Sequence, residues 1–294
     1  ECEKYYKKNG FHLSRYEICV GYMALGGIPF YLDKLRTDLT ITDNIDRIFF
    51  ADELIHQEFM DVYTGLYASK ERYVDIVKAL GGRFYGMTQA EISQATGIKT
   101  GGSLTKLLEN LHESGITREY PRFGKERVEK VYQLKDFFSL FYLRFAHKKQ
   151  VKPGGWRDLF GKGEYYKWAG DTFELLCIEH LSQMTNALRL RSVDRDYCFS
   201  GKSADGTGAQ IDLVMESKAA NTDFLCEMKF SGSKYSITAD YEQNLQNKIE
   251  AFAVSKMHKS MRSLQVVLVT TMGLASGIHA SIINQTLTLD DLFA

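Results

Sequence analysis

The first stretch of the chain carries apolar residues at helical spacing. Residues 17–25 and 45–63 place apolar side chains three or four positions apart, which is the pattern of amphipathic helices. Between them, residues 24–32 read ALGGIPFYL: the glycine pair ends one helix, and Pro29 is suited to the first turn of the next. Local chemistry alone therefore predicts a helix-turn-helix corner.

Three further helices and a hairpin are predicted next. A helix over residues 71–80 ends at a glycine pair, and Thr88 followed by Glu91 has the spacing of a capping box. Residues 103–114 place four leucines on one helical face, and Gly115 ends that helix. A polar and basic hairpin follows over residues 116–134. Three helices with a hairpin after the third are typical of a winged helix.

A winged helix can bind DNA with its third helix and its wing. The third helix enters the major groove while cations of the wing contact phosphate. Such modules also bind proteins or connect domains, and Glu119, Glu126 and Glu129 interrupt the charge of this wing, so both uses stay open. The candidate DNA contacts are Lys99, Thr100, Ser103, Thr105, Lys106, Arg118, Arg122, Lys125 and Arg127.

The last part of the chain reads as an α/β domain. Residues 136–145 (DFFSLFYLRF) form an aromatic stripe that predicts a buried connecting helix, and a Pro-Gly-Gly break at 153–155 marks a boundary. Strands framed by helices then predict a mixed sheet covered on both faces. The predicted helices span 168–187, 240–257 and 276–283, and the predicted strands span 193–199, 209–215, 223–230 and 264–271.

Charged residues inside two of these apolar strands need an explanation. Asp212 lies within an Ile-Asp-Leu-Val run, and alternation puts Glu227 and Lys229 on one face of the next strand. Burial of an unpaired charge is costly, so the three side chains are expected to meet one another or a cation.

Two carboxylates from neighbouring strands make an oxygen-rich site that suits Mg²⁺, together with the Met228 carbonyl. Glu174 on the preceding helix could supply a third carboxylate. The ion could polarise a phosphoryl oxygen and lower the pKa of bound water, while Lys229 stabilises the developing charge. The pattern predicts phosphodiester hydrolysis, and the alternative is a buried ion cluster without metal.

Composition limits the class of protein. A chain of 294 residues, 44% apolar and 25% charged, is typical of a globular protein with two or three domains. No apolar run is long enough to cross a membrane, so we expect a soluble protein without a membrane partner. Five scattered cysteines without a C-x-x-C pair favour a reducing, cytoplasmic setting.

Charge is unevenly distributed along the chain although the net charge is zero. Residues 66–150 hold 15 Lys and Arg against 9 Asp and Glu. The ratio is 7 to 11 before this segment and 15 to 17 after it. Only the predicted winged helix is therefore basic, which is modest support for a nucleic-acid surface.

Three segments together resemble a known family. The corner GGIPFYL at 26–32, the block at 87–111, and the strand motifs QIDL and CEMK resemble the C-terminal two thirds of P-loop ATPases of the AAA-like class from archaea and bacteria. The resemblance implies an α+β multidomain protein: a helical lid segment over 1–68, a winged helix over 69–149, and a domain similar to PD-(D/E)xK nucleases over 150–294. That last domain would be a restriction-endonuclease-like mixed sheet flanked by helices.

The resemblance also implies roles for individual residues. Asp212, Glu227 and Lys229 match the nuclease motif, with Asp212 and Glu227 as metal ligands, and Glu174 matches the acid of the helix. The phosphate-binding loop G-x-x-x-x-G-K-[ST] of the ATPases does not occur in the sequence, so we expect no ATP site in this chain.

Two functions are therefore expected as alternatives. The first is a Mg²⁺-dependent nuclease domain that a winged helix delivers to DNA. The second is a non-catalytic module that binds DNA or protein as part of an ATPase. Because the sequence starts at Glu1 rather than Met, we expect the ATPase core to lie in the missing part of a longer chain, in a partner chain, or to be lost.

Overall fold

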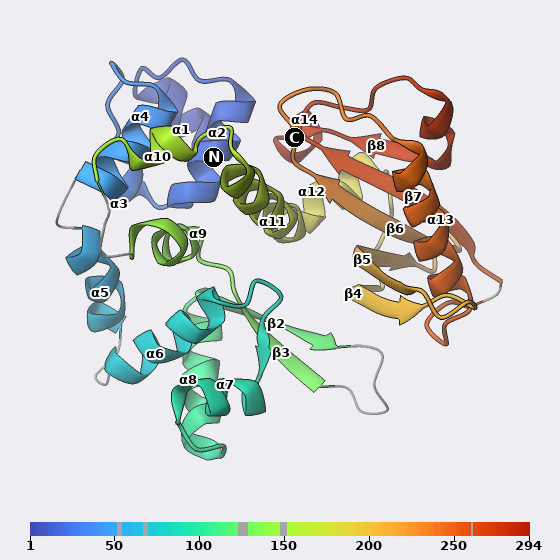
Figure 1. The fold of residues 1–294 in the computed structure, drawn as a ribbon, viewed down its shortest axis with the longest axis horizontal. Coiled ribbons are helices and arrows are strands. Elements are labelled where there is room, and N and C mark those ends of the chain that lie inside the picture. The colour runs from blue at the N-terminus through green and yellow to red at the C-terminus, as the bar shows by residue number, and fades with distance from the viewer. Residues whose placement is uncertain (52–54, 67–69, 123–128, 148–151, 260) are drawn as a thin grey trace. The chain divides into compact units, whose positions relative to one another are not determined.

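The structure is a computed structural model that describes residues 1–51, 55–66, 70–122, 129–147, 152–259 and 261–294 (Figure 1). It contains many helices and two sheets, one of three strands and one of five, which confirms the predicted mixed α+β class. The chain forms two compact units, Glu1–Tyr120 with Lys130–Ala169 and Pro121–Glu129 with Gly170–Ala294. The predicted division into three domains stays a prediction.

The first unit begins with a set of helices. Helix α2 has Ser14 as its N-cap with a capping box to Glu17, and Pro29 stands at the start of α3, as the predicted corner requires. Gly26 ends α2 with a φ of 68°, a value that favours glycine. The helices are α1 (Cys2–Lys8), α2 (Arg15–Leu25), α3 (Pro29–Leu32), α4 (Ile41–Asp46), the π-helical turn η1 (Arg47–Ala51) and α5 (Ile55–Leu66).

An aromatic helix packs against α2, α3, η1 and α5. It consists of α9 (Phe137–Phe141) and the π-helical turn η2 (Tyr142–Ala146). The ring of Phe138 stacks on Tyr31 at 4.3 Å between centroids, and the ring of Phe141 lies 4.5 Å from that of Phe49. The predicted burial of the stripe at 136–145 is thereby confirmed for its aromatic residues. Helix α10 (Gly155–Leu159) adds Trp156 to the same core.

The helix–hairpin segment follows the expected order. Thr88 caps α7 with the predicted capping box to Glu91, and the four leucines of α8 are buried. A short strand that the sequence did not indicate, β1, joins the hairpin in a sheet of order β1-β3-β2. The elements are α6 (Lys70–Gly81), β1 (Met87–Thr88), α7 (Gln89–Thr96), α8 (Gly102–Glu113), β2 (Thr117–Arg122) and β3 (Glu129–Leu134).

The second unit contains the mixed sheet of order β4-β5-β6-β7-β8. Its first three strands are antiparallel, and β6, β7 and β8 are parallel. Helix α13 (Ala239–Ala253) packs on β4 and β5, where Phe252 joins an apolar cluster with Phe199 and Val214. The strands are β4 (Arg195–Lys202), β5 (Gly208–Ser217), β6 (Thr222–Lys229), β7 (Ser263–Thr270) and β8 (Gln285–Leu287).

Two predicted helices differ from the structure. The helix expected over 168–187 is two helices, α11 (Gly163–Glu179) and α12 (Leu181–Ala187), with His180 between them. The helix expected over 276–283 is only the short 3₁₀ turn η3 (Ile278–Ile282). Strand β8 and helix α14 (Leu289–Leu292) follow it, and they are too short for a periodic pattern to reveal.

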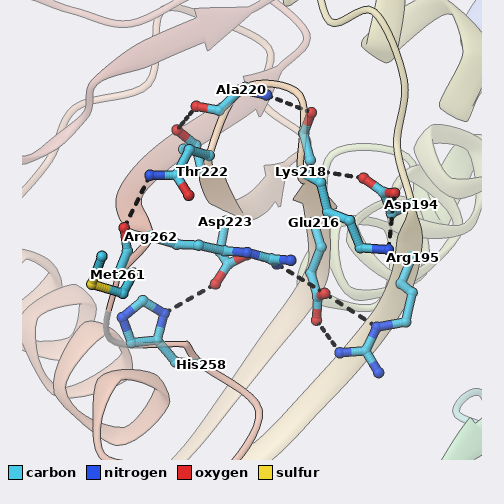
Figure 2. A network of polar contacts seen from close by, with 12 residues as sticks. Asp194, Arg195, Glu216, Lys218, Ala220, Thr222, Asp223, His258, Met261 and Arg262 are labelled. Atoms are coloured by element: carbon cyan, nitrogen blue, oxygen red, sulfur yellow. Dashed lines mark hydrogen bonds and ion pairs between the residues drawn. The ribbon is translucent and has the colours of Figure 1, made fainter.

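A row of charges that includes the buried carboxylates Glu216 and Asp223 joins the strands at one end of the sheet (Figure 2). Arg195, Glu216 and Asp223 are direct cross-strand partners on β4, β5 and β6. Two facing carboxylates repel each other, and Arg262 offsets this because its Nη1 lies 3.0 Å from Glu216 and 2.7 Å from Asp223. His258 contacts the other oxygen of Asp223 at 3.0 Å. Arg262, directly before β7, therefore links the start of that strand to β5 and β6.

Replacing Arg262 should destabilise the second unit strongly. Arg262→Met leaves Glu216 and Asp223 buried with one cation fewer, and we expect a loss of about 3 kcal/mol or more in urea unfolding. Lys218→Met is the matched control, because the Lys218–Asp194 pair is exposed and should contribute no more than about 1 kcal/mol. Equal losses in the two variants would contradict this account.

Candidate functional site

The candidate site lies where β5 separates from β6. The two strands pair from Ser217 and Thr222 up to Leu213 and Cys226, and the next residues along are Asp212 and Glu227. Beyond the last pair, the Met228 N–H donates to the Asp212 carboxylate instead of to a backbone carbonyl of β5, with 3.0 Å between N and Oδ2. The structure thus brings together the two carboxylates that the sequence indicated.

A β-bulge in β5 explains why Asp212 can turn toward β6. Tyr197 pairs with Val214, whereas Phe199 pairs with Ile211, so β5 has one residue more than β4 between these pairs. With unbroken pairing, Phe199 would face Asp212 and a carboxylate would stand in the apolar cluster. The bulge puts Ile211 into that cluster instead.

Glu227 is the centre of the site. Its side chain is almost fully buried, yet both oxygens have donors. Oε1 lies 2.7 Å from Lys248 Nζ, and Oε2 accepts from the Tyr241 hydroxyl at 3.0 Å and lies 3.5 Å from Lys229 Nζ. Burial raises the pKa of Tyr241, so this hydroxyl stays neutral and remains a donor. Helix α13 supplies two of the three partners.

Asp212 is held less tightly than Glu227. Among the described residues its Oδ1 accepts no hydrogen bond, and 9% of the residue is exposed. Burial, followed by the negative charge of Glu227, raises the pKa of Asp212 to about 6. The nearby lysines act in the opposite direction but do not cancel this effect. Asp212 is therefore the carboxylate of the pair that is available to a further cation.

Lys229 and Thr270 complete the same face of the sheet. Burial alone would lower the pKa of Lys229, but the charges of Asp212 and Glu227 outweigh it and raise this pKa above its usual value. Thr270 is the register partner of Lys229 on β7, and its hydroxyl is buried without a hydrogen-bond partner among the described residues. A buried hydroxyl without a hydrogen-bond partner is unusual and costs free energy, so Thr270 is an oxygen next to Lys229 that the fold itself does not use.

Glu174 is buried on α11 and takes part in interactions of its own. Its charge contributes to the raised pKa of Lys229. Within the part of the chain that the structure describes, no three His, Cys, Asp or Glu side chains are grouped so that they could hold a metal ion. A cation here would therefore rest on Asp212 and Glu227 with other oxygens. These residues fit Mg²⁺ in their chemistry, provided that Lys248 leaves Glu227.

Three residues of this site were missed in the sequence: Lys248, Tyr241 and Thr270. Tyr241 and Lys248 stand seven positions apart, two turns along one face of α13, and this spacing on the helix after an acidic strand was the available signal. Thr270 gave no signal, because it ends an apolar run. Cys226 points away from the site and packs with its sulfur 3.7 Å from that of Met215.

The predicted DNA contacts fall into three groups. Those before and at the start of α8 (Lys99, Thr100, Ser103 and Lys106) are exposed, and Thr105 accepts a hydrogen bond from Gln89. Arg118 on β2 is bound within the protein, since its Nε donates to Gln133 at 2.6 Å and its guanidinium lies over Tyr120. Lys125, Arg127 and the side chain of Arg122 lie outside the described residues.

Comparisons with known proteins identify no family for this chain. No protein-family model matches it, and no curated protein matches it. A solved structure described as a protein of unknown function, AF1548, matches with 11% identity and a TM-score of 0.28. The match covers 40% of this chain and 64% of that one. Similarity at this level assigns neither a fold family nor a function.

None of the helices in the described parts of the chain combines the length and the apolar character needed to cross a membrane.

The raised pKa of Asp212 predicts a stability effect that depends on pH. The pKa of Asp212 is about 6 in the folded protein, which is higher than in the unfolded chain. Protonated Asp212 therefore favours the folded state, an effect that is fully present below about pH 4 and is lost as the pH rises through 6. Asp212→Asn should therefore be more stable than the wild type at pH 7.5, by about 1 to 3 kcal/mol, with the difference vanishing near pH 4.

Asp194→Asn is a control of opposite sign for this measurement. The backbone N–H of Lys218 holds the pKa of Asp194 below its usual value, so this variant should be the less stable one at neutral pH. Thermal unfolding from pH 4 to 7.5 measures both differences. A pH-independent difference for Asp212→Asn would contradict the assigned burial of its charge.

The unpaired hydroxyl of Thr270 predicts a stabilising substitution. Thr270→Val keeps the shape of the side chain and removes an unsatisfied buried group, so urea unfolding should show a gain of about 1 kcal/mol. Thr222→Val is the matched control, because the hydroxyl of this similarly buried threonine donates to the Ala220 carbonyl at 2.9 Å. It should lose stability. A loss for both variants would mean that Thr270 has a partner in solution.

Proposed function

We propose that this chain is the DNA-binding region of an ATPase-family protein and that its second unit hydrolyses phosphodiester bonds with Mg²⁺. One observation carries the proposal: Asp212 and Glu227 converge from neighbouring strands at the place where these strands separate, with Lys229 on the same face. Buried carboxylates and ammonium groups in one place are costly, so their presence together favours a use in chemistry.

The arrangement of elements in the second unit supports a nuclease-like fold. Helix α13 packs on the mixed sheet, and the site lies at the end of β6, next to β7 with which it is parallel. A restriction-endonuclease-like domain is the architecture that the resemblance to PD-(D/E)xK proteins implies. The motif residues Asp212, Glu227 and Lys229 supply the chemistry that such a domain needs.

Each residue of the site has a role in the proposed reaction. Bound Mg²⁺ would neutralise charge at a phosphate oxygen and activate water. Asp212 and Glu227 would hold the ion, and Tyr241 keeps Glu227 in place by its hydrogen bond. Lys229 stays protonated because its pKa is raised, so it can stabilise negative charge that develops on the phosphate.

The helix–hairpin segment supports DNA binding in the manner of a winged helix. Exposed Lys99 and Lys106 lie before and within the first turns of α8, the helix that enters the major groove in such modules. The excess of positive charge in residues 66–150 favours contact with phosphate. Arg118 is already hydrogen-bonded to Gln133, so it supports contact with DNA less than the exposed Lys99 and Lys106 do. The proposal of DNA binding therefore rests on α8 more than on the described part of the wing.

The proposed partner besides DNA is an ATPase core. The corner at residues 26–32 presents two exposed apolar side chains, Ile28 and Phe30, with 41% and 52% of their surface accessible. Exposed apolar groups of this size favour a protein contact. An ATPase core outside this chain, as the GGIPFYL motif implies, is the partner that we propose.

A second function is favoured by the contacts of Glu227. Lys248, Tyr241 and Lys229 already satisfy both of its oxygens, so the cluster is stable without a metal ion. On this alternative, the second unit is a nuclease-like fold without activity and the chain is a DNA- or protein-binding module.

Cation binding and DNA nicking separate the two functions. We expect isothermal calorimetry to detect Mg²⁺ or Mn²⁺ binding at millimolar concentration or below, and the protein to nick plasmid DNA. Asp212→Asn should lose both activities, since it removes the carboxylate with the open oxygen. Asp205→Asn, the same change on an exposed turn of this unit, should keep both.

A further variant tests the DNA-binding part of the proposal. Lys106→Ala should weaken DNA binding and leave cation binding unchanged, because Lys106 lies on α8 and not at the site. Absence of cation binding in the wild type at 10 mM, roughly the upper limit for a functional site of this kind, would leave the non-catalytic module as the function.

A further inference from the structure

Lys248 binds the carboxylate oxygen of Glu227 that a metal ion at this site would use. Its Nζ lies 2.7 Å from Oε1 of Glu227, closer than the 3.5 Å between Lys229 and Oε2 of the same residue. The Lys248 side chain is only 14% exposed, so water screens this ion pair little. The ammonium group is in effect the resident cation of the site.

The charges of the site balance without a metal ion. Asp212 and Glu227 contribute two negative charges, and Lys229 and Lys248 contribute two positive ones. A divalent cation added to this neutral group would create a net charge of two, which is unfavourable in a buried place. One lysine therefore has to give up its carboxylate, and an incoming phosphodiester would supply a new negative charge.

Lys248 is better placed than Lys229 to exchange its partner. It stands within α13 (Ala239–Ala253), whose backbone hydrogen bonds do not depend on the side chain, and a lysine has a flexible stem of four carbons. Lys229 is held additionally by the ring of Tyr241, with its Nζ 5.3 Å from the ring centroid. Release of Lys248 also leaves Glu227 with the Tyr241 hydrogen bond.

We propose that Lys248 is an exchange cation: a divalent ion displaces it from Glu227, and the freed ammonium group binds a phosphate oxygen of the nucleic acid. This inference rests on the proposed function and adds a mode of regulation to it. Without nucleic acid, Lys248 competes with the metal ion and keeps its affinity low. With nucleic acid present, the phosphate stabilises the displaced lysine, so the two ligands bind cooperatively.

The test is calorimetric titration of the full chain with Mn²⁺, with and without a short phosphorothioate oligonucleotide that resists cleavage. In the wild type, the oligonucleotide should raise the Mn²⁺ affinity several-fold. In Lys248→Met, Mn²⁺ should bind about tenfold more tightly without oligonucleotide, since a competing charge is gone. The oligonucleotide should then have little further effect.

Two variants serve as controls, and a third is a substitute for the test variant. Lys248→Arg keeps the charge and should bind Mn²⁺ as the wild type does. Lys256→Met removes one positive charge from an exposed position of the same unit and should also resemble the wild type. Lys248→Gln keeps a donor for Glu227 and replaces Lys248→Met if that variant does not fold, with the same expected gain.

The outcomes distinguish the inference from the function on which it rests. Equal Mn²⁺ affinities in the wild type and the two neutral variants would overturn the role of Lys248 and leave the proposed function standing. An oligonucleotide effect of the same size in Lys248→Met would do the same. Absence of Mn²⁺ binding in every variant would overturn both.

Discussion

The constraint on which this part of the molecule depends is the removal of the Glu227 carboxylate from water. A charged group in that position requires donors on all sides, and the chain provides them from separate elements. Strand β6 contributes Lys229, while α13 contributes Tyr241 and Lys248. The helix is therefore fixed on the sheet by polar contacts at one end and by Phe252 in the apolar cluster at the other.

Strand β6 carries two charged clusters that differ in how their charges are held. Asp223 and Glu227 lie on one face of β6, separated by Leu225, which belongs to the apolar cluster. At Asp223 the negative charges are neutralised by Arg262, which forms ion pairs with Glu216 and Asp223 (Figure 2). At Glu227 the cations are the ammonium groups of Lys229 and Lys248, and Asp212 Oδ1 accepts no hydrogen bond from the residues that the structure describes. The first cluster joins strands, and the second is suited to exchange.

Local sequence signals predicted the elements but not their contacts. The capping box at Thr88, the leucine face of α8 and the central strands follow from short-range patterns, and they occur as predicted. The position of Asp212 and Glu227 on adjacent strands followed from the charges inside apolar runs. These features depend on residues close together in the chain.

The remaining features depend on how elements pack. Which face of α13 meets the sheet decides that Lys248 reaches Glu227, and no spacing in β6 contains that information. The hydroxyl of Thr270 became informative only when its neighbours were known to leave it unpaired. Arg118 looked like a free cation of the wing because Gln133, its partner, lies on the other strand of the hairpin.

The extra residue in β5 makes the site sensitive to chain length. If Leu213 were deleted, Tyr197 could keep Val214 and Phe199 could keep Ile211 as partners, so the sheet and its apolar cluster would survive. Asp212 would then stand opposite Cys198, on the other face of the sheet from Glu227. The deletion of one codon would thus separate the two carboxylates while the fold and every charged residue of the motif stay in place.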